Sequence, residues 1–381
     1  MEQKRIKVLV MFGTRPEAIK MVPLIPELQK YPDIFEPIVV STGQHREMLA
    51  QVLALFEIEP DHDLDVMVPN QTLAGLTSRL IQKLDALFSE VKPDVVLVHG
   101  DTTTALAGGL AAYYHQIPIG HVEAGLRTYD KYSPFPEEMN RHLVDTLATF
   151  HFAPTQTSAD HLRSEGLPDT YIRITGNTVI DALQTVVQKP CDLPLDLDWG
   201  ARRVILVTAH RRESFGEPLE NICQALKNIA AQYPDVEIVY PVHYNPNVRR
   251  TVYAQLEGVE RIHLIDPLDY LEFAHMMAKS YLILTDSGGI QEEAPALGVP
   301  VLVMRDVTER PEAVAAGTVR IVGTDTAAIE AEVDALMQPA AHRAMSQAIN
   351  PYGDGLASSR IVSILKEAFA HEPALDPTQP V

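Results

Sequence analysis

The sequence has few cysteines and no long apolar segment. Its 381 residues include two cysteines, Cys191 and Cys223, which are too few for a disulfide framework and form no CxxC metal pair. No stretch approaches the roughly 18 consecutive apolar residues of a membrane-spanning helix. The N-terminal MEQKRIKVLVMFG passes from charged residues directly into an apolar run, without the pattern of a secretory signal. These absences predict a soluble, cytoplasmic protein with free thiols and no membrane partner.

Basic residues are scarce relative to acidic ones. The chain carries 31 Lys and Arg against 51 Asp and Glu, a net charge of −20. Nucleic acids and anionic membranes bind to basic surfaces, so the charge predicts neither as a partner. A locally basic pocket would still accept an anionic small molecule. The hydrophobic fraction of 46% is enough for packed cores, and the length suits two domains.

Several common catalytic and cofactor motifs are missing. There is no HExxH and no clustered His/Cys spacing, so we predict no metal site. The absence of GxGxxG is evidence against a tightly bound NAD, and the absence of GxSxG leaves a serine triad without support.

Twelve short apolar runs alternate with helical patterns along the chain. The runs are RIKVLVMFG, EPIVVST, DVVLVHG, IPIGHVE, FHFAPT, YIRITG, RVILVTAH, EIVYPVH, RIHLIDP, YLILTDS, PVLVMRD and TVRIVG. Continuous apolar runs are typical of parallel strands covered on both faces, and intervening helices indicate βαβ crossovers. Six runs precede and six follow the Pro- and Asp-rich stretch 188–203. The pattern predicts an α/β protein with two Rossmann-like domains, each containing a parallel sheet.

We place the crossing between the domains near residues 176–181. This gives an N-terminal domain over 1–176 and a C-terminal domain over 177–356. The amphipathic ASSRIVSILKEAF predicts a helix over 357–370 that completes the N-terminal domain, and the Pro-rich residues 371–381 are expected to form a flexible tail.

Ionisable and hydroxyl side chains follow six of the predicted strands. They are Arg15, Asp101, Glu123, His210, His243 and Ser287. Ligands of open parallel sheets bind beyond the carboxyl ends of the strands. We therefore expect Glu123 to face a cleft, although its strand is apolar, and two further acids follow it in the Pro-flanked loop of SPFPEEMNR.

The first of these strand ends reads GTRPEAIK. Thr14 and Glu17 fit a capping box, which predicts a helix start. Arg15 then lies in the first helical turn, where a cation opposes the helix dipole at a cost of about 0.3–1 kcal/mol. An anionic ligand would reverse that cost, so we interpret Arg15 as a binding residue. Lys20 is either a second ligand contact or an ordinary surface residue.

A second candidate anion site reads TDSGGIQEEA. We expect Ser287 to cap a helix and Gly288 and Gly289 to let a phosphate approach the backbone. Arg310 follows in the nearby RDVTERPEA. Glu292 and Glu293 either complement the helix dipole or accept ribose hydroxyls.

A histidine with two arginines occupies the end of another predicted strand, in AHRRES. A lone histidine is more often structural than catalytic. Because His210 lies next to Arg211 and Arg212 at a strand end, we interpret it as a phosphate contact or a proton-transfer group.

Eight longer motifs resemble one enzyme family. They are GTRPEAIKMVPLI, TGQHREML, VHGDTTTALAGGLAA, HVEAGLRT, SPFPEEMNR, TGNTVIDAL, TAHRRES and LTDSGGIQEEAPALGVPVLVMRDVTERPEA. In this order they resemble the non-hydrolysing UDP-N-acetylglucosamine 2-epimerases, over about residues 6 to 370. The resemblance implies a two-domain glycosyltransferase-B architecture with the substrate in the interdomain cleft. It also implies interconversion of UDP-GlcNAc and UDP-ManNAc by a homodimer without NAD, metal or other cofactor.

The resemblance also assigns residues to roles. The catalytic set is Asp101, Glu123, Glu137 and His210, and the substrate-binding set is Arg15, Lys20, Phe273, Ser287, Gly288, Gly289, Glu293 and Arg310. Phe273 matches the residue beside the uracil, whereas helical spacing alone would place it in the core. The reaction implied is elimination of UDP to 2-acetamidoglucal followed by re-addition. Which carboxylate removes the C2 proton and which returns it stays open.

Some bacterial members of this family bind a second UDP-GlcNAc as an activator. The positions that match that contact set are Gln44, Glu138, Arg211 and His243. Glu47 and Asn70 depart from it, since activated relatives tend to carry Gln and Arg there. An anionic Glu47 beside a diphosphate is unfavourable unless another cation offsets it.

Four alternative functions remain open from the sequence. The same fold serves epimerases of modified sugars such as UDP-2,3-diacetamido uronic acids, and hydrolysing 2-epimerases that release free ManNAc. A glycosyltransferase is a further alternative, as is a nucleotide-sugar sensor. A sensor would gain nothing from three carboxylates near a dianionic diphosphate.

Overall fold

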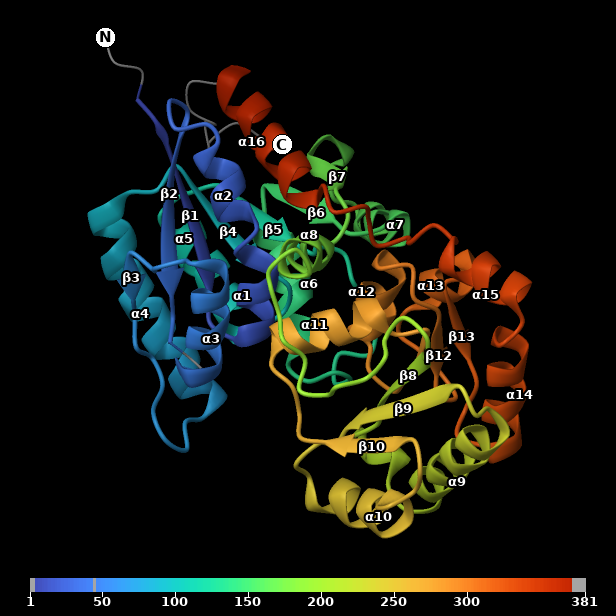
Figure 1. The fold of residues 1–381 in the computed structure, drawn as a ribbon. Coiled ribbons are helices and arrows are strands. Elements are labelled where there is room, and N and C mark those ends of the chain that lie inside the picture. The colour runs from blue at the N-terminus through green and yellow to red at the C-terminus, as the bar shows by residue number, and fades with distance from the viewer. Residues whose placement is uncertain (1–3, 44–45, 372–381) are drawn as a thin grey trace. The chain divides into compact units, whose positions relative to one another are not determined.

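The computed structural model describes residues 4–43 and 46–371. Contacts divide the chain into two units. Unit 1 comprises residues up to Ala182 and those from Tyr352 onward, and unit 2 comprises Leu183–Pro351. Each unit is an α/β domain with one sheet (Figure 1).

Unit 1 contains seven parallel strands in the order β3-β2-β1-β4-β5-β6-β7. They are β1 (Ile6–Phe12), β2 (Phe35–Ser41), β3 (His62–Asp63), β4 (Val95–His99), β5 (Ile119–Val122), β6 (Phe150–Ala153) and β7 (Ile172–Ile174). Its helices are α1 (Arg15–Met21), α2 (Leu24–Gln29), α3 (Arg46–Phe56), α4 (Leu73–Val91), α5 (Thr103–Tyr114), α6 (Glu137–Leu147), α7 (Gln156–Ser164), the 3-10 helix η1 (Asp169–Tyr171), α8 (Thr178–Val186), which leads into unit 2, and α16 (Ala357–His371).

Unit 2 contains six parallel strands in the order β10-β9-β8-β11-β12-β13. They are β8 (Arg203–Thr208), β9 (Val236–Pro241), β10 (Ile262–Ile265), β11 (Leu282–Thr285), β12 (Val301–Val303) and β13 (Val319–Ile321). Its helices are the 3-10 helix η2 (Arg212–Ser214), α9 (Glu217–Gln232), α10 (Pro246–Leu256), α11 (Tyr270–Lys279), α12 (Ile290–Ala296), α13 (Pro311–Ala316), α14 (Thr326–Leu336) and α15 (Pro339–Ser346).

The prediction of two Rossmann-like parallel sheets is confirmed. Every one of the twelve apolar runs contains a strand, and all five residues of β4 are buried, as expected for a sheet covered on both faces. The thirteenth strand, β3, was missed because its two residues, His62 and Asp63, carry no apolar signal. In both sheets the strand order reverses after the first strand, between β1 and β4 and between β8 and β11. Such a reversal is where doubly wound sheets bind ligands.

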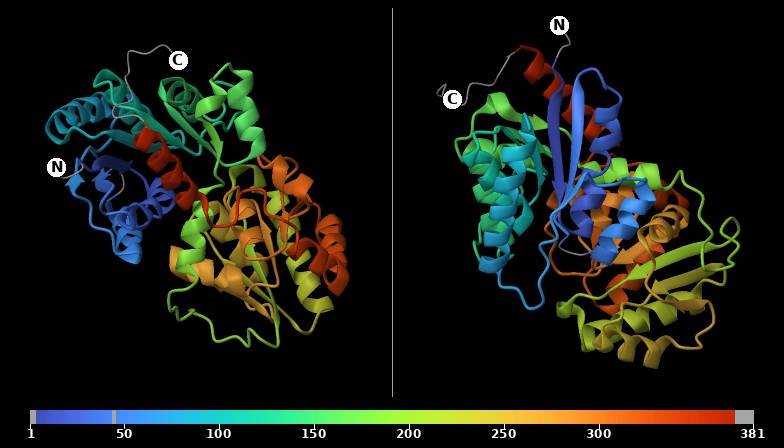
Figure 2. Two further views of the ribbon diagram at one scale, coloured as in Figure 1. Left: turned by 90° about the horizontal axis from the view of Figure 1, so that it is seen from above. Right: turned by 90° about the vertical axis from the view of Figure 1, so that its left-hand side faces the viewer.

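The last described helix, α16, belongs to unit 1. It packs along α2, as both views of Figure 2 allow the reader to follow. The Asp181 carboxylate accepts the backbone N–H groups of Ala357 at 3.2 Å and Ser358 at 2.7 Å at the start of α16. An acid here satisfies donors that lack helical partners. The helix predicted from ASSRIVSILKEAF is confirmed.

Within the described residues, no helix is both long and apolar enough to cross a membrane.

Candidate active site

The turn after β1 is built on the predicted capping box, which is confirmed. Thr14 caps α1, and the Glu17 carboxylate accepts the backbone N–H of Thr14 at 2.8 Å. Glu17 also accepts the hydroxyl of Thr102 at 2.6 Å, in the turn after β4. Burial raises the pKa of Glu17, although the bonds from Thr102 and Thr14 oppose that rise. The cap thus joins the turn that carries Arg15 to the turn that carries Asp101.

Arg15 is the first residue of α1 and is half-buried. Among the described residues it makes no hydrogen bond or ion pair. Its guanidinium is therefore available to an anion, and it lies in the first turn of the helix, where a cation opposes the dipole.

Glu123 follows β5 directly and has the left-handed backbone φ of +66°, which a non-glycine residue rarely adopts. Its carboxylate pairs with Lys20, accepts the amide N–H of Asn177 at 2.7 Å and lies 3.7 Å from His99 Nε2. Burial alone would raise the pKa of Glu123, but the charges of Lys20 and His99 hold it well below its usual value. Glu123 is a buried, ionised carboxylate with a cation beside it.

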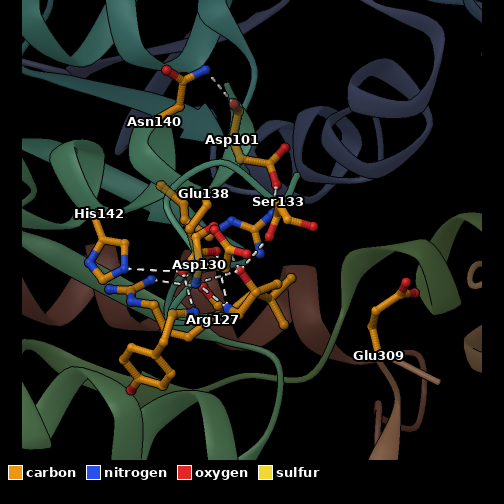
Figure 3. Close-up of polar contacts among 12 residues, drawn as sticks. Asp101, Arg127, Asp130, Ser133, Glu138, Asn140, His142 and Glu309 are labelled. Atoms are coloured by element: carbon orange, nitrogen blue, oxygen red, sulfur yellow. Dashed lines mark hydrogen bonds and ion pairs between the residues drawn. The ribbon is translucent and has the colours of Figure 1, made fainter. Parts of the chain in front are cut away.

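Asp101 follows β4 and contacts helix α6. Its carboxylate accepts Arg141 Nη2 at 2.5 Å, and its backbone oxygen accepts Asn140 Nδ2 at 2.8 Å. Figure 3 shows the Asn140 side chain pointing toward Asp101. The Asp101 side chain remains 29% exposed, which leaves part of it accessible to a ligand.

Glu137 opens helix α6 and is half-buried. Residues three and four positions apart share a helix face, so Glu137 lies on the same face as Asn140 and Arg141, which contact Asp101. The structure thus brings Glu137 to the side of α6 that meets the end of β4. β4 and β5 are neighbouring strands, paired through His99 and Val122, so the three predicted carboxylates gather at one edge of the unit 1 sheet.

Glu138 has a different environment from its neighbour. It is buried and accepts the backbone N–H of Thr128 at 3.1 Å and of Tyr129 at 2.8 Å (Figure 3). Burial would raise the pKa of Glu138, but these backbone bonds and the charge of Arg141 lower it. Glu138 therefore anchors the loop between β5 and α6, a structural task beyond the activator contact predicted for it.

A buried charge cluster supports these turns from behind. His121 on β5 lies 2.5 Å from Asp145 Oδ1 and 2.7 Å from the Gly100 carbonyl oxygen, next to Asp101. Arg127 pairs with Asp145 at 2.8 Å. Burial opposes ionisation of Asp145, but His121 and Arg127 lower its pKa to about 2. The cluster thus fixes the backbone around the carboxylate edge, the edge of the unit 1 sheet where Asp101, Glu123 and Glu137 lie.

In unit 2 the ends of β8 and β11 are joined side by side. Thr208 and Thr285 are register partners, and their hydroxyls lie 2.6 Å apart. One residue later, the Asp286 carboxylate accepts the backbone N–H of His210 at 2.7 Å and of Arg211 at 2.8 Å. Asp286 is fully buried. It fixes the backbone of the loop that presents His210.

The His210 ring is partly exposed and stacks on His243, with ring centroids 5.2 Å apart. Burial lowers the pKa of His210, Asp286 opposes this, and His243 and Arg211 lower it further. The lowered pKa of His210 favours the neutral ring, a state suited to accepting a proton.

The prediction that Ser287 caps α12 is wrong. The helix begins at Ile290, and its N-cap is Gly289, with no side-chain cap bond. Two glycines let the chain turn once more before the helix starts, so Ser287 lies two residues too early. Its own N–H donates to the Thr285 hydroxyl at 2.9 Å.

Two arginines converge on Gly288. A Cβ placed there would lie 3.8 Å from Arg211 Nη2 and 4.0 Å from Arg310 Nη2. Glu309 lies at the same place, 3.7 Å from Arg211, and Glu292 pairs with Arg310. Burial would raise the pKa of Glu309, but Arg305, Arg211 and Arg310 lower it. The absence of a side chain at Gly288 leaves room for an anion beside two guanidinium groups.

Helix α11 supplies the aromatic part of this region. Phe273 is half-buried, whereas helical spacing alone predicted a core position. On the same helix, the Tyr270 hydroxyl lies 3.4 Å from Glu293 Oε2. Glu293 Oε1 would lie 3.3 Å from a Cβ at Gly289. Phe273, Glu293 and the glycine pair thus come from adjoining segments of unit 2.

The predicted activator positions are only partly described. Gln44 and the side chain of Glu47 lie outside the described residues, and Asn70 is exposed in the turn before α4. Arg211 and His243 both lie beside His210. No group of three or more His, Cys, Asp or Glu side chains suited to a metal ion occurs among the residues that the structure describes.

Sequence reasoning missed several residues that hold the site together. They are Asn140, Arg141, Asn177, Asp286 and Glu309. For two of them the sequence contained a usable pattern. Arg141 lies one helical turn after Glu137. Asp286 directly follows an apolar strand, and Asp101 lies two residues after one.

Comparisons with known proteins decide the family. The model of the family described as UDP-N-acetylglucosamine 2-epimerase matches residues 27–366. The chain belongs to the UDP-N-acetylglucosamine 2-epimerase family. It is 57% identical over 371 residues to the Escherichia coli K12 enzyme of that name, covering 95% of this chain and 98% of that protein. The Bacillus subtilis enzyme is 54% identical over 363 residues, 95% of each chain.

A solved member of the family has the same fold. The Neisseria meningitidis UDP-GlcNAc 2-epimerase, crystallised with UDP-GlcNAc, matches with a TM-score of 0.84 at 51% identity, over 95% of this chain and 100% of that one.

Proposed function

We propose that this member of the family interconverts UDP-GlcNAc and UDP-ManNAc without releasing free sugar. The observation that carries the proposal is the carboxylate edge of unit 1, where Asp101, Glu123 and Glu137 gather. The family membership and the bound UDP-GlcNAc of the Neisseria enzyme support the choice of substrate.

The chemistry requires both kinds of group found in the two units. The hydrogen on sugar C2 has no carbonyl beside it, so simple deprotonation is too slow. Instead, the C1–O bond breaks with its electron pair leaving on UDP while a carboxylate takes the C2 proton. A C1=C2 double bond forms, giving 2-acetamidoglucal. Returning a proton to the opposite face of C2 and the diphosphate oxygen to C1 completes the inversion.

The leaving diphosphate needs positive and dipolar groups that are in place before reaction. We propose that Arg310 and the Gly288–Gly289 turn bind it in unit 2, together with His210, and that Arg15 adds a further cation. Phe273 and Glu293 are proposed to contact the uridine. The convergence of Arg211 and Arg310 on Gly288 supports this assignment.

The environments of the carboxylates favour different proton roles. Glu123 is held ionised by Lys20 and His99, which makes it a weak base while that pairing lasts. A ligand phosphate that drew Lys20 away would strengthen Glu123 as a base. Glu137 makes no hydrogen bond or ion pair within the described part of the chain and is the less constrained carrier. We therefore propose Glu123 and Glu137 as the proton carriers on opposite faces, with Asp101 positioning the sugar or assisting one of them.

Incubation of UDP-GlcNAc with the protein in D2O tests the reaction. We expect UDP-ManNAc still joined to UDP, with deuterium at C2 in both sugars at equilibrium. Nuclear magnetic resonance of the products distinguishes the alternatives. Free ManNAc would indicate a hydrolysing epimerase, and inversion without C2 exchange would exclude the elimination pathway. If UDP-GlcNAc is unchanged but a 2,3-diacetamido uronic acid derivative reacts, the substrate assignment is wrong.

A further inference from the structure

Asp286 has one carboxylate oxygen that its structural task does not use. Oδ2 accepts both backbone N–H groups of the His210–Arg211 loop, and Ser214 Oγ lies 3.5 Å from it. Oδ1 is buried and has no hydrogen bond among the described residues. It lies 3.5 Å from Nδ1 of the His210 ring. A buried carboxylate oxygen without a donor is costly, so a structure retains one only where something else requires it.

The strand register accounts for this arrangement. Thr208 and Thr285 are partners on β8 and β11, and the Asp286 N–H donates to the Thr208 carbonyl at 3.1 Å. The segments that follow β8 and β11 therefore lie next to each other. This places the Asp286 side chain against the loop that contains His210. The buried Tyr240 closes the space behind, with its hydroxyl donating to the Ala209 carbonyl at 2.9 Å. The His210 ring lies beside Oδ1, with its Nδ1 3.5 Å away.

We propose that Asp286 is a positioning residue that fixes the tautomer of His210: Nδ1–H faces Asp286 Oδ1, and Nε2 faces the ligand, where it can carry a proton to the leaving diphosphate oxygen and take it back. A separation of 3.5 Å is long for a hydrogen bond. A small rotation of the ring when a ligand engages Nε2 shortens it, as catalytic hydrogen bonds tighten in substrate complexes. The role rests on the proposed function only in that His210 is assumed to act on the substrate.

The tautomer matters because the two ring nitrogens then have different tasks. With Nδ1–H bound to a carboxylate, Nε2 can take a proton and return it, and the resulting imidazolium is stabilised by Asp286. With the opposite tautomer, Nε2–H can only donate. A merely structural Asp286 would need its backbone bonds alone, and either tautomer would serve.

Asp286→Asn separates these two roles. The amide oxygen can still accept the N–H groups of His210 and Arg211, so the loop keeps its anchor. The amide NH2 then occupies the position of Oδ1 and donates to Nδ1, which forces the proton onto Nε2. We expect kcat for epimerisation to fall by about 10²–10⁴, the usual contribution of a positioned acid–base group, while KM and the thermal unfolding temperature change little. Asp325→Asn, which caps α14 in the same unit, is the matched control and should leave kcat unchanged.

Two readouts distinguish positioning from structure. In protein labelled with ¹⁵N-histidine, the His210 signal is identified by its loss in His210→Gln. We expect the Nδ1–H tautomer in the wild type and the Nε2–H tautomer in Asp286→Asn. In the pH profile of kcat, the limb that belongs to His210 should move to lower pH in Asp286→Asn. Asp286 raises the pKa of His210 while His243 and Arg211 lower it, so removing the carboxylate leaves only the lowering groups.

Each result has one meaning. Reversal of the tautomer with loss of kcat supports the inference. Full kcat in Asp286→Asn, with kcat lost in His210→Gln, overturns it and leaves the proposed function standing. An Nε2–H tautomer in the wild type also overturns it, and this measurement does not depend on turnover. If the wild type does not exchange the C2 hydrogen in D2O, the proposed function fails, while the tautomer assignment is still decided by the ¹⁵N signals.

Discussion

The two units place different chemistry on equivalent strand ends. The fourth strand in chain order ends in an acid in each unit, at Asp101 after β4 and Asp286 after β11. Asp101 is 29% exposed and bonded to an arginine side chain. Asp286 is fully buried and bonded to backbone N–H groups. The same topology therefore yields a partly exposed acid in one unit and a buried loop anchor in the other. Burial and partners, rather than position in the sheet, decide the role.

At the next pair of strand ends, after β5 and β12, the two units carry side chains of opposite charge. Glu123 follows β5 beside Lys20, whereas Arg305 follows shortly after β12 and pairs with Glu213 and Glu309. In unit 1 the acid lies at the strand end and the cation comes from a helix. In unit 2 the cation lies there, and the acids come from the 3-10 helix η2 and from the loop before α13. Unit 1 thus presents a buried acid paired with a lysine at this strand end, and unit 2 presents an arginine paired with two acids.

The largest effect is expected from neutralising the unit 1 acid. Glu123→Gln keeps the shape of the side chain but cannot carry the C2 proton, so kcat should fall by about 10²–10⁴. The affinity for UDP, measured by calorimetry, should stay within a few-fold because Glu123 is not among the groups assigned to the diphosphate. Glu27→Gln, an acid of the same unit that pairs with Lys30, is the matched control. Normal turnover with lost UDP affinity would reverse the assignment of the two units.

The complementary change removes a unit 2 cation. Arg310→Ala should weaken UDP binding by about 10- to 100-fold, as expected for losing charge-assisted hydrogen bonds worth about 1.5–3 kcal/mol. It also leaves the buried Glu292 without its arginine, so the variant should unfold at a lower temperature.

The double variant Arg310→Ala/Glu292→Gln separates stability from binding. It should regain the unfolding temperature without regaining affinity, because the buried charge that lost its arginine is gone but the anion contact is not restored. Arg320→Ala, which breaks an exposed pair with Glu332, should change neither quantity. Recovery of UDP affinity in the double variant would exclude Arg310 from the anion site.

An intermediate effect tests the charge cluster behind the carboxylate edge. The pKa of Asp145 is about 2 in the folded protein, against 3.8 for an ordinary aspartate. Because the folded value is depressed, its stabilisation is complete above pH 4 and is lost as the pH falls through about 2. We expect this group to contribute about 2 kcal/mol to the free energy of unfolding near neutral pH. Urea unfolding between pH 5 and pH 2 measures it.

Asp145→Asn should flatten that acid dependence while lowering stability at pH 7. The exposed Asp354, which pairs with Arg360, is a control, and Asp354→Asn should change the slope much less. An unchanged slope in Asp145→Asn would mean that other carboxylates account for the acid sensitivity.

Much of the fold was predictable because parallel strands leave a strong local signal. Continuous apolar runs such as DVVLVHG are short and rich in valine, and β4 within this run is completely buried, as a parallel strand covered on both faces should be. The two-residue β3 has no such signal, since it exists only through its pairing with Val40 and Ser41. The Ser287 cap failed for a related reason. The sequence of a glycine pair does not show at which residue the following helix begins.

The sequence could propose candidate site residues where an acidic residue closely follows a strand, as Asp101 and Glu123 do. Arg141 and Asn177 were missed because their contacts span 40 and 54 residues of chain. A partner so distant in sequence is determined by packing, which no local pattern records. Glu138 shows that the sequence can also hide a structural role. Its position matches a ligand contact of the family, but its carboxylate accepts backbone N–H groups.

The smallest effect concerns Arg15, where binding and stability should move in opposite directions. Arg15→Gln removes a cation from the first turn of α1 and keeps a residue of similar helix propensity. The free energy of unfolding of the unliganded protein should rise by about 0.3–1 kcal/mol, because the charge no longer opposes the helix dipole. Arg15→Lys keeps the charge and should match the wild type.

With saturating UDP-GlcNAc the wild type should become more stable than Arg15→Gln, because the arginine then has an anion to bind and ligand affinity adds to stability. Thermal unfolding with and without ligand measures both signs, and lower stability of unliganded Arg15→Gln would show that Arg15 supports the fold rather than the ligand.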